Sequence, residues 1–364
     1  MAIQDLFKPL AMKRGPTLKN RLLLAPLTNW QSDDQNGIAS EYDLNWITNC
    51  AAGGHSMVMT CASHVHQFGK TFPGQLGVYS DAHIEGLRSI ADIIRSHGGI
   101  SSIQIQHGGA RVQPARGGTP VGPSCLPEYH ARGLTLDEIH NLRQDFVAAA
   151  KRAETAGFDG VEVHGAFGWI LMQFLSPRFN KRTDHYGGSF ENRSRLLFEV
   201  IDDIRAACRP DFQIGLRLSL ETRYEIKLSE FQQVAARAFK EEAIDFLDLA
   251  LGDYRNIAQE APFEGETVLS IFTALPRGAV CLGASGHIFS ASDAAFVLEA
   301  GCDFAMVGRA AILDPNFPNN VQKHPMYSAP SLPVSESDLR QTGLSERFIT
   351  YMRTWRGFIA QDME

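Results

Sequence analysis

Eight short apolar segments recur along the chain and alternate with stretches of helical periodicity. Uninterrupted apolar runs are typical of strands buried on both faces, as in a parallel sheet covered by helices. Eight such repeats favour closure into a (β/α)8 barrel, a TIM barrel of the α/β class. The strands are expected at residues 21–26, 57–62, 100–106, 160–164, 214–219, 246–251, 279–284 and 304–308.

The stretches between these strands have the length and spacing of helices. Thr135 and Glu138 have the spacing of a capping box, and the helix that they begin is expected to end at Gly157. The rival architecture, a doubly wound dinucleotide fold, needs G-x-G-x-x-G after its first strand, and the turn at 25–30 contains no glycine. The barrel is therefore preferred. The other helices are expected at about 40–50, 84–95, 190–207, 229–242, 267–275 and 291–300.

The composition changes after residue 318, where Pro325, Pro330 and Pro333 fall among serine and asparagine residues, as in a linker. The sequence thus predicts three parts. They are a barrel at residues 1–318, a linker at 319–334 and a C-terminal helical extension at 335–364. The extension lies outside the repeat, so we expect it to pack on the barrel or on a partner subunit.

Composition and charge limit the class of protein. With 44% hydrophobic and 21% charged residues, the chain resembles a soluble globular protein, and no apolar stretch reaches the roughly 18 residues of a membrane span. A net charge of −7 gives no basis for binding nucleic acid. The first residues lack a secretory signal, so a cytoplasmic protein is expected. The partner is expected to be a small molecule, and the sequence leaves open a homo-oligomer.

The six cysteines indicate neither a disulfide framework nor a metal centre. No two of them form a C-x-x-C pair, and none is followed by closely spaced histidines. Reduced thiols and no bound metal are the expectation.

Active sites of (β/α)8 barrels lie where the strands end, at the carboxyl edge. The loops after the last two expected strands, 284–286 and 308–310, consist of small residues and Arg309. Such loops bind phosphate groups in many barrels, because small residues let the backbone N–H groups approach and arginine adds a paired donor. The other strand-end residues are Pro26, Thr28, Ala62, Gln104, His107, His164, Arg217 and Gly252.

One long motif carries a specific family resemblance. Residues 174–177 read F-L-S-P, residues 180–189 read N-K-R-T-D-H-Y-G-G-S and residues 191–193 read E-N-R. This stretch resembles the corresponding one of the old yellow enzyme family. The resemblance spans residues 1 to about 318 and fades in the tail. It also covers residues 6–9, 19–21, 104–109 and 307–309.

The resemblance implies a barrel that holds FMN without a covalent bond. NADH or NADPH would reduce the flavin, and an electron-poor alkene would reoxidise it. By position, the ring system of the flavin would be lined by Ala25, Pro26, Leu27, Thr28 and Ala62, with Gln104 on its pyrimidine edge and Arg217 beside N1. The phosphate would be held by Ser285, Gly286, Gly308 and Arg309.

The chemistry of Arg217 agrees with this assignment. Reduction leaves negative charge around flavin N1, and a fixed guanidinium there stabilises it. An arginine inside an apolar strand is costly to bury unless an anionic group meets it. The alternative is a structural ion pair.

The segment after the fourth expected strand departs from the family pattern. Typical members have two donors to the carbonyl oxygen of the acceptor, spaced H-x-x-N or H-x-x-H, followed by a tyrosine that protonates the α-carbon. Here the first donor is His164, but the second is Phe167 and the acid is Trp169. Losing one donor to an oxyanion costs roughly 3–4 kcal/mol, and losing a general acid removes about 10²–10⁴ in rate.

The expected acceptor site is therefore aromatic, formed by His164, Phe167, Trp169 and Trp30. Such a wall favours a flat acceptor over a small enone. Replacements for the missing donor and acid are water or one of Gln106, His107, Tyr224 and Tyr254.

The sequence thus predicts an FMN-dependent NAD(P)H oxidoreductase that transfers hydride from flavin N5 to an electron-poor acceptor and reduces ordinary enones poorly. His164 is the expected catalytic residue. The alternative is a catalytically impaired flavin-binding module that serves in ligand binding or regulation. A lyase or aldolase is disfavoured because no lysine ends an expected strand.

Overall fold

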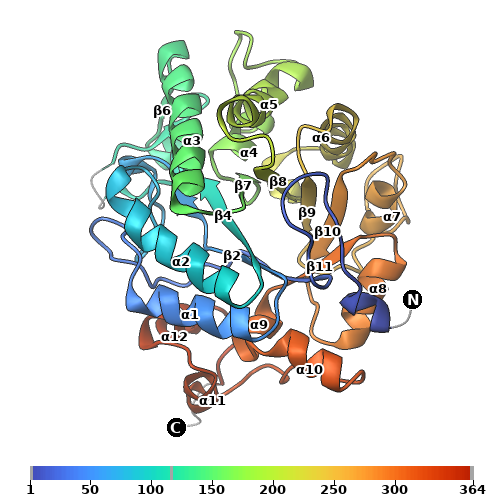
Figure 1. Cartoon of the computed structure of the whole chain (residues 1–364). Helices are drawn as coiled ribbons and strands as arrows, with labels where there is room; N and C mark the ends of the chain where they lie inside the picture. The colour runs from blue at the N-terminus through green and yellow to red at the C-terminus, as the bar shows by residue number, and fades with distance from the viewer. Residues whose placement is uncertain (1–2, 115–117, 361–364) are drawn as a thin grey trace.

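A closed barrel of eight parallel strands forms the centre of the computed structural model, which describes residues 3–114 and 118–360 (Figure 1). The strand that contains Met57 pairs with the strand that contains Ile100, and this pairing of the first and last strands in the order below closes the ring. The predicted fold is confirmed. In pairing order the strands are β2 (Met57–Met59), β1 (Leu22–Leu24), β11 (Phe304–Val307), β10 (Cys281–Ser285), β9 (Phe246–Ala250), β8 (Gln213–Ser219), β7 (Gly160–Gly165) and β4 (Ile100–Gln106).

Helices cover the outside of the barrel between successive strands (Figure 1). The predicted capping box is confirmed: Thr135 accepts the N–H of Glu138, and Gly157 ends the helix in the left-handed conformation with φ of 92°. The covering helices are α1 (Glu41–Ala52), α2 (Ile84–Ser96), α3 (Leu136–Ala156), α5 (Phe190–Ala207), α6 (Leu228–Glu241), α7 (Val268–Thr273) and α8 (Ala291–Glu299). After the last strand come α9 (Arg309–Leu313) and α10 (Phe317–Lys323).

Two predicted strands are only half as long as expected: the segment 21–26 is a strand only at Leu22–Leu24, and the segment 57–62 is interrupted. The segment 57–62 forms β2 only as far as Met59, and pairing with β4 resumes at β3 (Ser63–His64). Between them the hydroxyls of Thr60 and Ser63 both donate to the carbonyl of Cys61. Side chains that bond the local backbone compete with the strand ladder, which accounts for the interruption.

Each strand buries both of its faces, and the inward face changes character along the barrel axis. On β8 the outward residues Ile214, Leu216 and Leu218 join the core under the helices. The inward residues at the N-terminal end of the barrel are apolar, among them Phe246 and Phe304. Farther along the axis the inward residues become polar: Ser102, Gln104, Glu162, Arg217 and Asp248, all buried.

The N-terminal segment closes the apolar end of the barrel. Leu10 pairs with Leu18, and the loop between them places Met12 in the cluster of inward apolar residues. The blue segment lies across the barrel beside β9 and β10 in Figure 1. It is fixed there by Arg14, whose Nη1 lies 3.0 Å from Oδ1 of Asp245, a carboxylate with no exposed surface.

Two excursions leave the barrel at its carboxyl edge. After β4 the chain forms a small parallel sheet of β5 (Val121–Gly122) and β6 (Arg132–Gly133) before it enters α3. After β7 a short helix, α4 (Ile170–Leu175), precedes the motif that ends at α5. Both excursions bring loops over the edge where the strands end.

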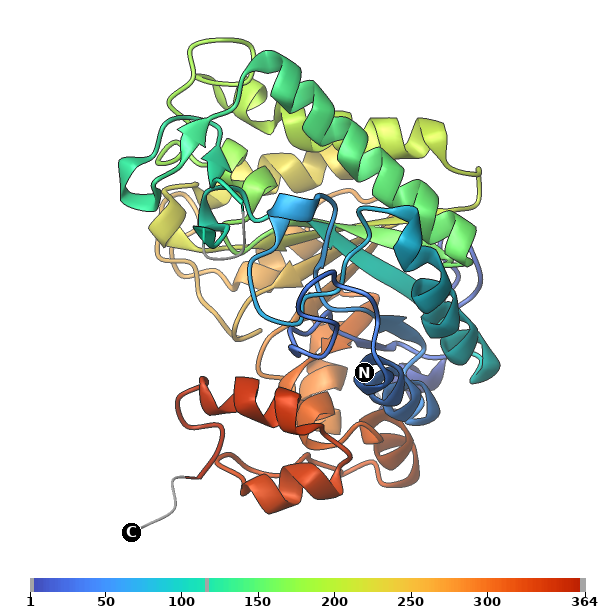
Figure 2. The same ribbon diagram turned by 90° about the vertical axis from the view of Figure 1, so that its left-hand side faces the viewer.

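The C-terminal extension packs on its own barrel (Figure 2). It forms two short helices, α11 (Glu336–Gln341) and α12 (Glu346–Arg353), with Gly343 between them at a φ of 87°. On α12 the ring of Phe348 lies 5.1 Å from that of Trp46 on α1. At its start, Ser345 donates to Oε1 of Gln31. The tail thus docks beside the connection between β1 and α1.

Helix α10 crosses the expected boundary between residues 318 and 319, so the first residues of the predicted linker are helical. The division into barrel, linker and extension stays a prediction. No helix in the described part of the chain is long and apolar enough to cross a membrane.

We predict that Asp245→Ala strongly destabilises the fold. Besides Arg14, this carboxylate accepts from Arg205 at 2.8 Å and from the backbone N–H of Ile214 at 2.8 Å. Removing one partner of a buried charge network costs about 3–5 kcal/mol. Urea unfolding measures the loss. The matched control is Asp92→Ala, which breaks an exposed pair with Arg95 and should cost about 0–1 kcal/mol. Equal losses for both variants would contradict the prediction.

Candidate active site

A cavity of about 370 Å³ opens at the carboxyl ends of β1, β8, β9, β10 and β11. Its size is within the range of small-molecule sites. It brings together residues that lie far apart in the sequence but were expected to act together. Of the predicted site residues it is lined by Ala25, Leu27, Phe167, Arg217, Ser285, Gly286, Gly308 and Arg309.

Further residues of the same wall were not anticipated from the sequence. His287 and Phe289 follow directly after the expected phosphate loop, so their position in the chain was a usable signal. Trp355 comes from the C-terminal extension, whose sequence assigned no residue to this cavity. Gly252 was expected at a strand end and also lines the cavity; the unanticipated lining residues are Ala250, His287, Ile288, Phe289, Met306 and Trp355.

One end of the cavity is formed by closely approaching backbone and a guanidinium. Gly286 has a φ of 131°, and a Cβ there would lie 2.8 Å from the carbonyl carbon of Gly252. Only glycine fits this conformation and this distance. Nη2 of Arg309 lies 3.4 Å from the carbonyl oxygen of Gly252, which holds the side chain at the rim. Exposed backbone beside an arginine suits a phosphate group.

Arg217 also lines the cavity and is only 5% exposed. Its Nη2 donates to Oγ of Ser285 at 3.2 Å, and its Nη1 lies 2.8 Å from Oδ2 of Asp248. The contact with Asp248 is an ion pair whose angle is poor for a hydrogen bond. Nε and Nη1 therefore lack hydrogen-bond acceptors among the described residues. The structural ion pair, which was the alternative interpretation of Arg217, exists, and Nε of the guanidinium has no acceptor among the described residues.

A buried carboxyl group lies next to this pair. Oε1 of Glu162 accepts from Nε2 of Gln104 at 2.6 Å, and Oε2 has no partner among the described residues. Burial, reinforced by the Asp248 carboxylate, raises the pKa of Glu162 to about 8. Burial also raises the pKa of Asp248, against the effect of Arg217. Gln104 is bonded to this carboxyl group and does not line the cavity, and its assignment to the pyrimidine edge of the flavin stays a prediction.

His164 is neutral and has a defined tautomer. Burial, and secondarily the Arg217 guanidinium, lower the pKa of His164 well below its ordinary value. Nδ1 accepts the backbone N–H of Ala166 at 3.3 Å. A neutral imidazole that accepts at Nδ1 carries its hydrogen on Nε2. His164 can therefore donate one hydrogen bond from Nε2.

Phe167 is held by its backbone in the left-handed region, with φ of 54°. Its N–H donates to Oγ of Ser219 at 2.8 Å, and its carbonyl accepts from Tyr224 at 3.2 Å and from Nη1 of Arg111. The ring is thereby directed into the cavity, and its centre lies 5.7 Å from Cζ of Arg217.

Trp169 is adjacent to a second cation. Cζ of Arg111 lies 4.3 Å from the centre of the Trp169 ring, a cation–π contact. The Trp169 ring centre is 6.5 Å from that of His164, with the two planes nearly perpendicular. The three residues of the departing motif thus lie together, as their spacing predicted.

The tail contributes a cluster of aromatic rings. The ring of Tyr351 lies 5.1 Å from Trp30 and 6.0 Å from Trp355. Burial raises the pKa of Tyr351, and hydrogen bonding to the side chains of Trp355 and Thr28 partly offsets this rise. Trp30 borders a separate surface hollow with Arg347. Its assignment to the acceptor site stays a prediction, as do those of Pro26, Thr28 and Ala62 to the flavin.

The candidates for a replacement acid are mostly engaged elsewhere. The Tyr224 hydroxyl is bonded to Phe167, and that of Tyr254 donates to Asp293 at 2.8 Å, which with burial raises the pKa of Tyr254 to about 12. Gln106 is buried, and both polar atoms of its amide lack partners among the described residues.

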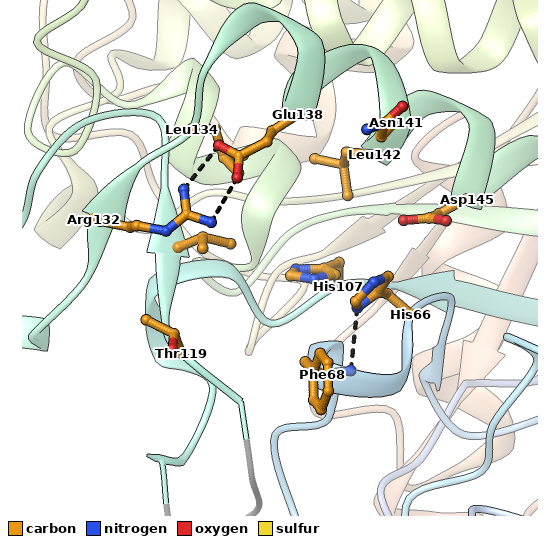
Figure 3. Close-up of a pocket in the computed structure, with 11 residues that line it drawn as sticks. His66, Phe68, His107, Thr119, Arg132, Leu134, Glu138, Asn141, Leu142 and Asp145 are labelled. Carbon is orange, nitrogen blue, oxygen red and sulfur yellow. Dashed lines mark hydrogen bonds and ion pairs between the residues drawn. The ribbon is translucent and has the colours of Figure 1, made fainter.

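His107 faces a different cavity, also of about 370 Å³, between the β4–α3 connection and α3 (Figure 3). Its ring lies 5.9 Å from that of His66, and Arg132 and Glu138 form an ion pair in the same wall. This second cavity has no lining residue in common with the cavity at Arg217.

Together these features define a class of protein: a (β/α)8 barrel enzyme whose strand ends hold a phosphorylated, redox-active ring. The residues fit FMN on two structural observations, the orphaned donors of Arg217 and the glycine cradle at Gly286 beside Arg309. The NADH:flavin oxidoreductase / NADH oxidase family model matches residues 5–327. The chain belongs to this family, that of the old yellow enzymes, and is an FMN-dependent oxidoreductase that uses NADH or NADPH.

Known proteins similar to the chain agree with this membership. A probable NADH-dependent flavin oxidoreductase, YqiG, of Bacillus subtilis is 34% identical over 88% of this chain and 88% of its own length. An NADPH dehydrogenase of Bacillus licheniformis is 32% identical over 89% of this chain and 95% of its own.

Two solved structures are similar in fold. An old yellow enzyme homologue from Zymomonas mobilis has a TM-score of 0.75 at 27% identity, over 92% of this chain and 96% of that one. A 2-naphthoyl-CoA reductase complex has a TM-score of 0.80 at 26% identity, over 88% of this chain but only 52% of the longer neighbour.

The raised pKa of Glu162 predicts a dependence of stability on pH. Its folded pKa of about 8 exceeds the roughly 4.3 of an unfolded glutamate, so the native state binds the extra proton. The stability from this proton is complete below about pH 4.3 and is lost as the pH rises from there through about 8, with a limiting slope of roughly 1.4 kcal/mol per pH unit. Urea unfolding should show this slope in the wild type and less of it in Glu162→Gln. Identical slopes would contradict the assignment.

Proposed function

We propose that this oxidoreductase passes hydride from flavin N5 to a flat, electron-poor acceptor and reduces ordinary enones poorly. Bound FMN supplies the hydride-accepting and hydride-donating ring. In this proposal Gly286, Gly308, Ser285 and Arg309 hold its phosphate, Arg217 stabilises the charge near N1, and His164 donates from Nε2 to the acceptor.

The observation that carries the proposal is the fixed backbone of Phe167. Three hydrogen bonds, from Tyr224 and Arg111 to its carbonyl and from its N–H to Ser219, hold it at a positive φ. The apolar ring is therefore built into the position where the family has its second donor. The acceptor oxygen then meets one donor, His164, and the missing one is worth roughly 3–4 kcal/mol in comparable sites.

The surroundings of His164 support an aromatic acceptor. The rings of Phe167 and Trp169 both stand edge-on to the imidazole, with centres at 5.7 and 6.5 Å. Rings so placed can contact a flat acceptor over a large area. Because Trp169 releases no proton near neutral pH and Tyr224 and Tyr254 are bonded elsewhere, water is the proton source in this proposal.

We predict that Trp355→Ala weakens FMN binding, because the indole forms one wall of the proposed flavin cavity. Losing the contact with this aromatic wall should cost about 1–2 kcal/mol of binding free energy, which corresponds to roughly a 5–30-fold higher dissociation constant. Fluorescence titration of the apoprotein with FMN measures this dissociation constant. Trp355→Phe is the matched control and should retain most of the affinity. Unchanged affinity in Trp355→Ala would place the flavin elsewhere.

The proposed function is tested by separating the two half-reactions without oxygen. The wild type should be reduced by NADH or NADPH and then reoxidised slowly by cyclohexenone. Phe167→Asn with Trp169→Tyr restores a donor and an acid, and asparagine tolerates the left-handed backbone. This double variant should reoxidise with the enone at least about 10²-fold faster.

The control for that experiment is Phe167→Leu with Trp169→Phe, which adds no polar group and should leave the enone rate low. Fast reoxidation of the wild type by cyclohexenone would overturn the proposal. Failure of both nicotinamide cofactors to reduce the bound flavin would favour a flavin-binding module without turnover.

A further inference from the structure

Four polar side chains on four neighbouring strands meet inside the barrel, below the cavity. They are Gln104 on β4, Glu162 on β7, Arg217 on β8 and Asp248 on β9. The strand register places Gln104 opposite Glu162 and Arg217 opposite Asp248. Neither carboxyl residue has exposed surface, and Arg217 is 5% exposed. The activity proposed above uses Arg217 but gives Glu162 and Asp248 no part.

The charges of this cluster do not balance if all three groups ionise. One guanidinium faces two carboxyl groups, and its Nη1 contacts Asp248 at 2.8 Å. Glu162 has instead a neutral amide partner, Gln104, at 2.6 Å. Two like charges in a medium of low polarity repel strongly, so Glu162 is the group that holds a proton. The other titratable group nearby, His164 on β7, has a pKa lowered by burial, and the inward polar residues of β4 are the uncharged Ser102, Gln104 and Gln106.

Reduction of a flavin beside Arg217 changes this balance. A hydride brings two electrons and one proton, so the ring gains one negative charge close to the guanidinium. Arg217 then faces two anionic groups, Asp248 and the ring edge. An ionised Glu162 would add a third anion in the same buried space, which is unfavourable at the Coulomb energies of a protein interior. Its protonated form is therefore favoured further.

We propose that, under alkaline conditions in which Glu162 is ionised in the oxidised enzyme, it takes up a proton when the flavin is reduced and releases it on reoxidation, so that the pH dependence of the flavin's reduction potential is set by this carboxyl group. The proton comes from water and forms the O–H bond of the Glu162 carboxyl group. Hydride transfer to the acceptor removes the charge from the ring, and the proton returns to water. The inference rests on the proposed position of the flavin beside Arg217, and it makes Glu162 a positioning residue rather than a catalytic one.

The test is the midpoint potential of the bound flavin as a function of pH. The wild-type holoenzyme should take up one proton per two electrons below the Glu162 pKa of about 8 and two protons above it. The slope of the midpoint potential against pH should therefore double as the pH rises past this pKa. In Glu162→Gln the slope should stay at one proton per two electrons throughout. Glu199→Gln, a glutamate on α5 outside the barrel, is the matched control and should keep the wild-type change in slope.

A second measurement needs no variant. Redox-difference infrared spectra of the wild type above pH 8 should gain a band of protonated carboxyl on reduction, and spectra at pH 6 should not. The inference would be overturned if the slope of the wild-type potential against pH stayed constant, or if the change in slope persisted in Glu162→Gln. The absence of the carboxyl band on reduction above pH 8 would overturn it as well. Failure of the proposed function is distinct: it appears as unchanged FMN affinity in Trp355→Ala or as fast enone turnover.

Discussion

The ion pair between Arg217 and Asp248 sets the constraint on which the rest of the site depends. Closing a parallel barrel forces every second residue of each strand inward, where water is scarce. A charge placed there needs a partner, and the pairing of β8 with β9 supplies one directly opposite. Among the described residues Nε of Arg217 has no acceptor and Nη1 has only its contact with Asp248, so the barrel contains an incompletely satisfied cation towards its carboxyl end. The stability of the interior and the chemistry of the site thus depend on the same two residues.

Much of this architecture could be predicted from the sequence, because it follows from local rules. Mainly apolar segments such as 214–219 predict buried strands, and the spacing of Thr135 and Glu138 predicts the start of a helix. Both patterns reflect contacts within a few residues. The residues at strand ends were predictable for the same reason: once the strands are assigned, the barrel places Arg217, Gly286 and Arg309 at one edge.

The rest could not be predicted because it depends on contacts across the fold. The sequence predicts that the tail packs on the barrel or on a partner subunit, but no local pattern specifies that α12 docks beside Gln31 and that Trp355 lines the cavity. Nor does the order of residues reveal that Glu162 bonds to Gln104 and so draws that amide away from the cavity, which requires the register of β4 with β7. Phe167 was visible as a departure, but the three bonds that fix its backbone join residues distant in sequence.

The docked tail has a consequence for how the enzyme is made. Ala25, at the end of the first strand, and Trp355, in the C-terminal extension, line the same cavity although 330 residues separate them in the chain. During synthesis, Ala25 leaves the ribosome long before Trp355, so a ribosome-bound chain has a cavity that is still open on one side. The cavity is therefore complete only after translation has passed the tail.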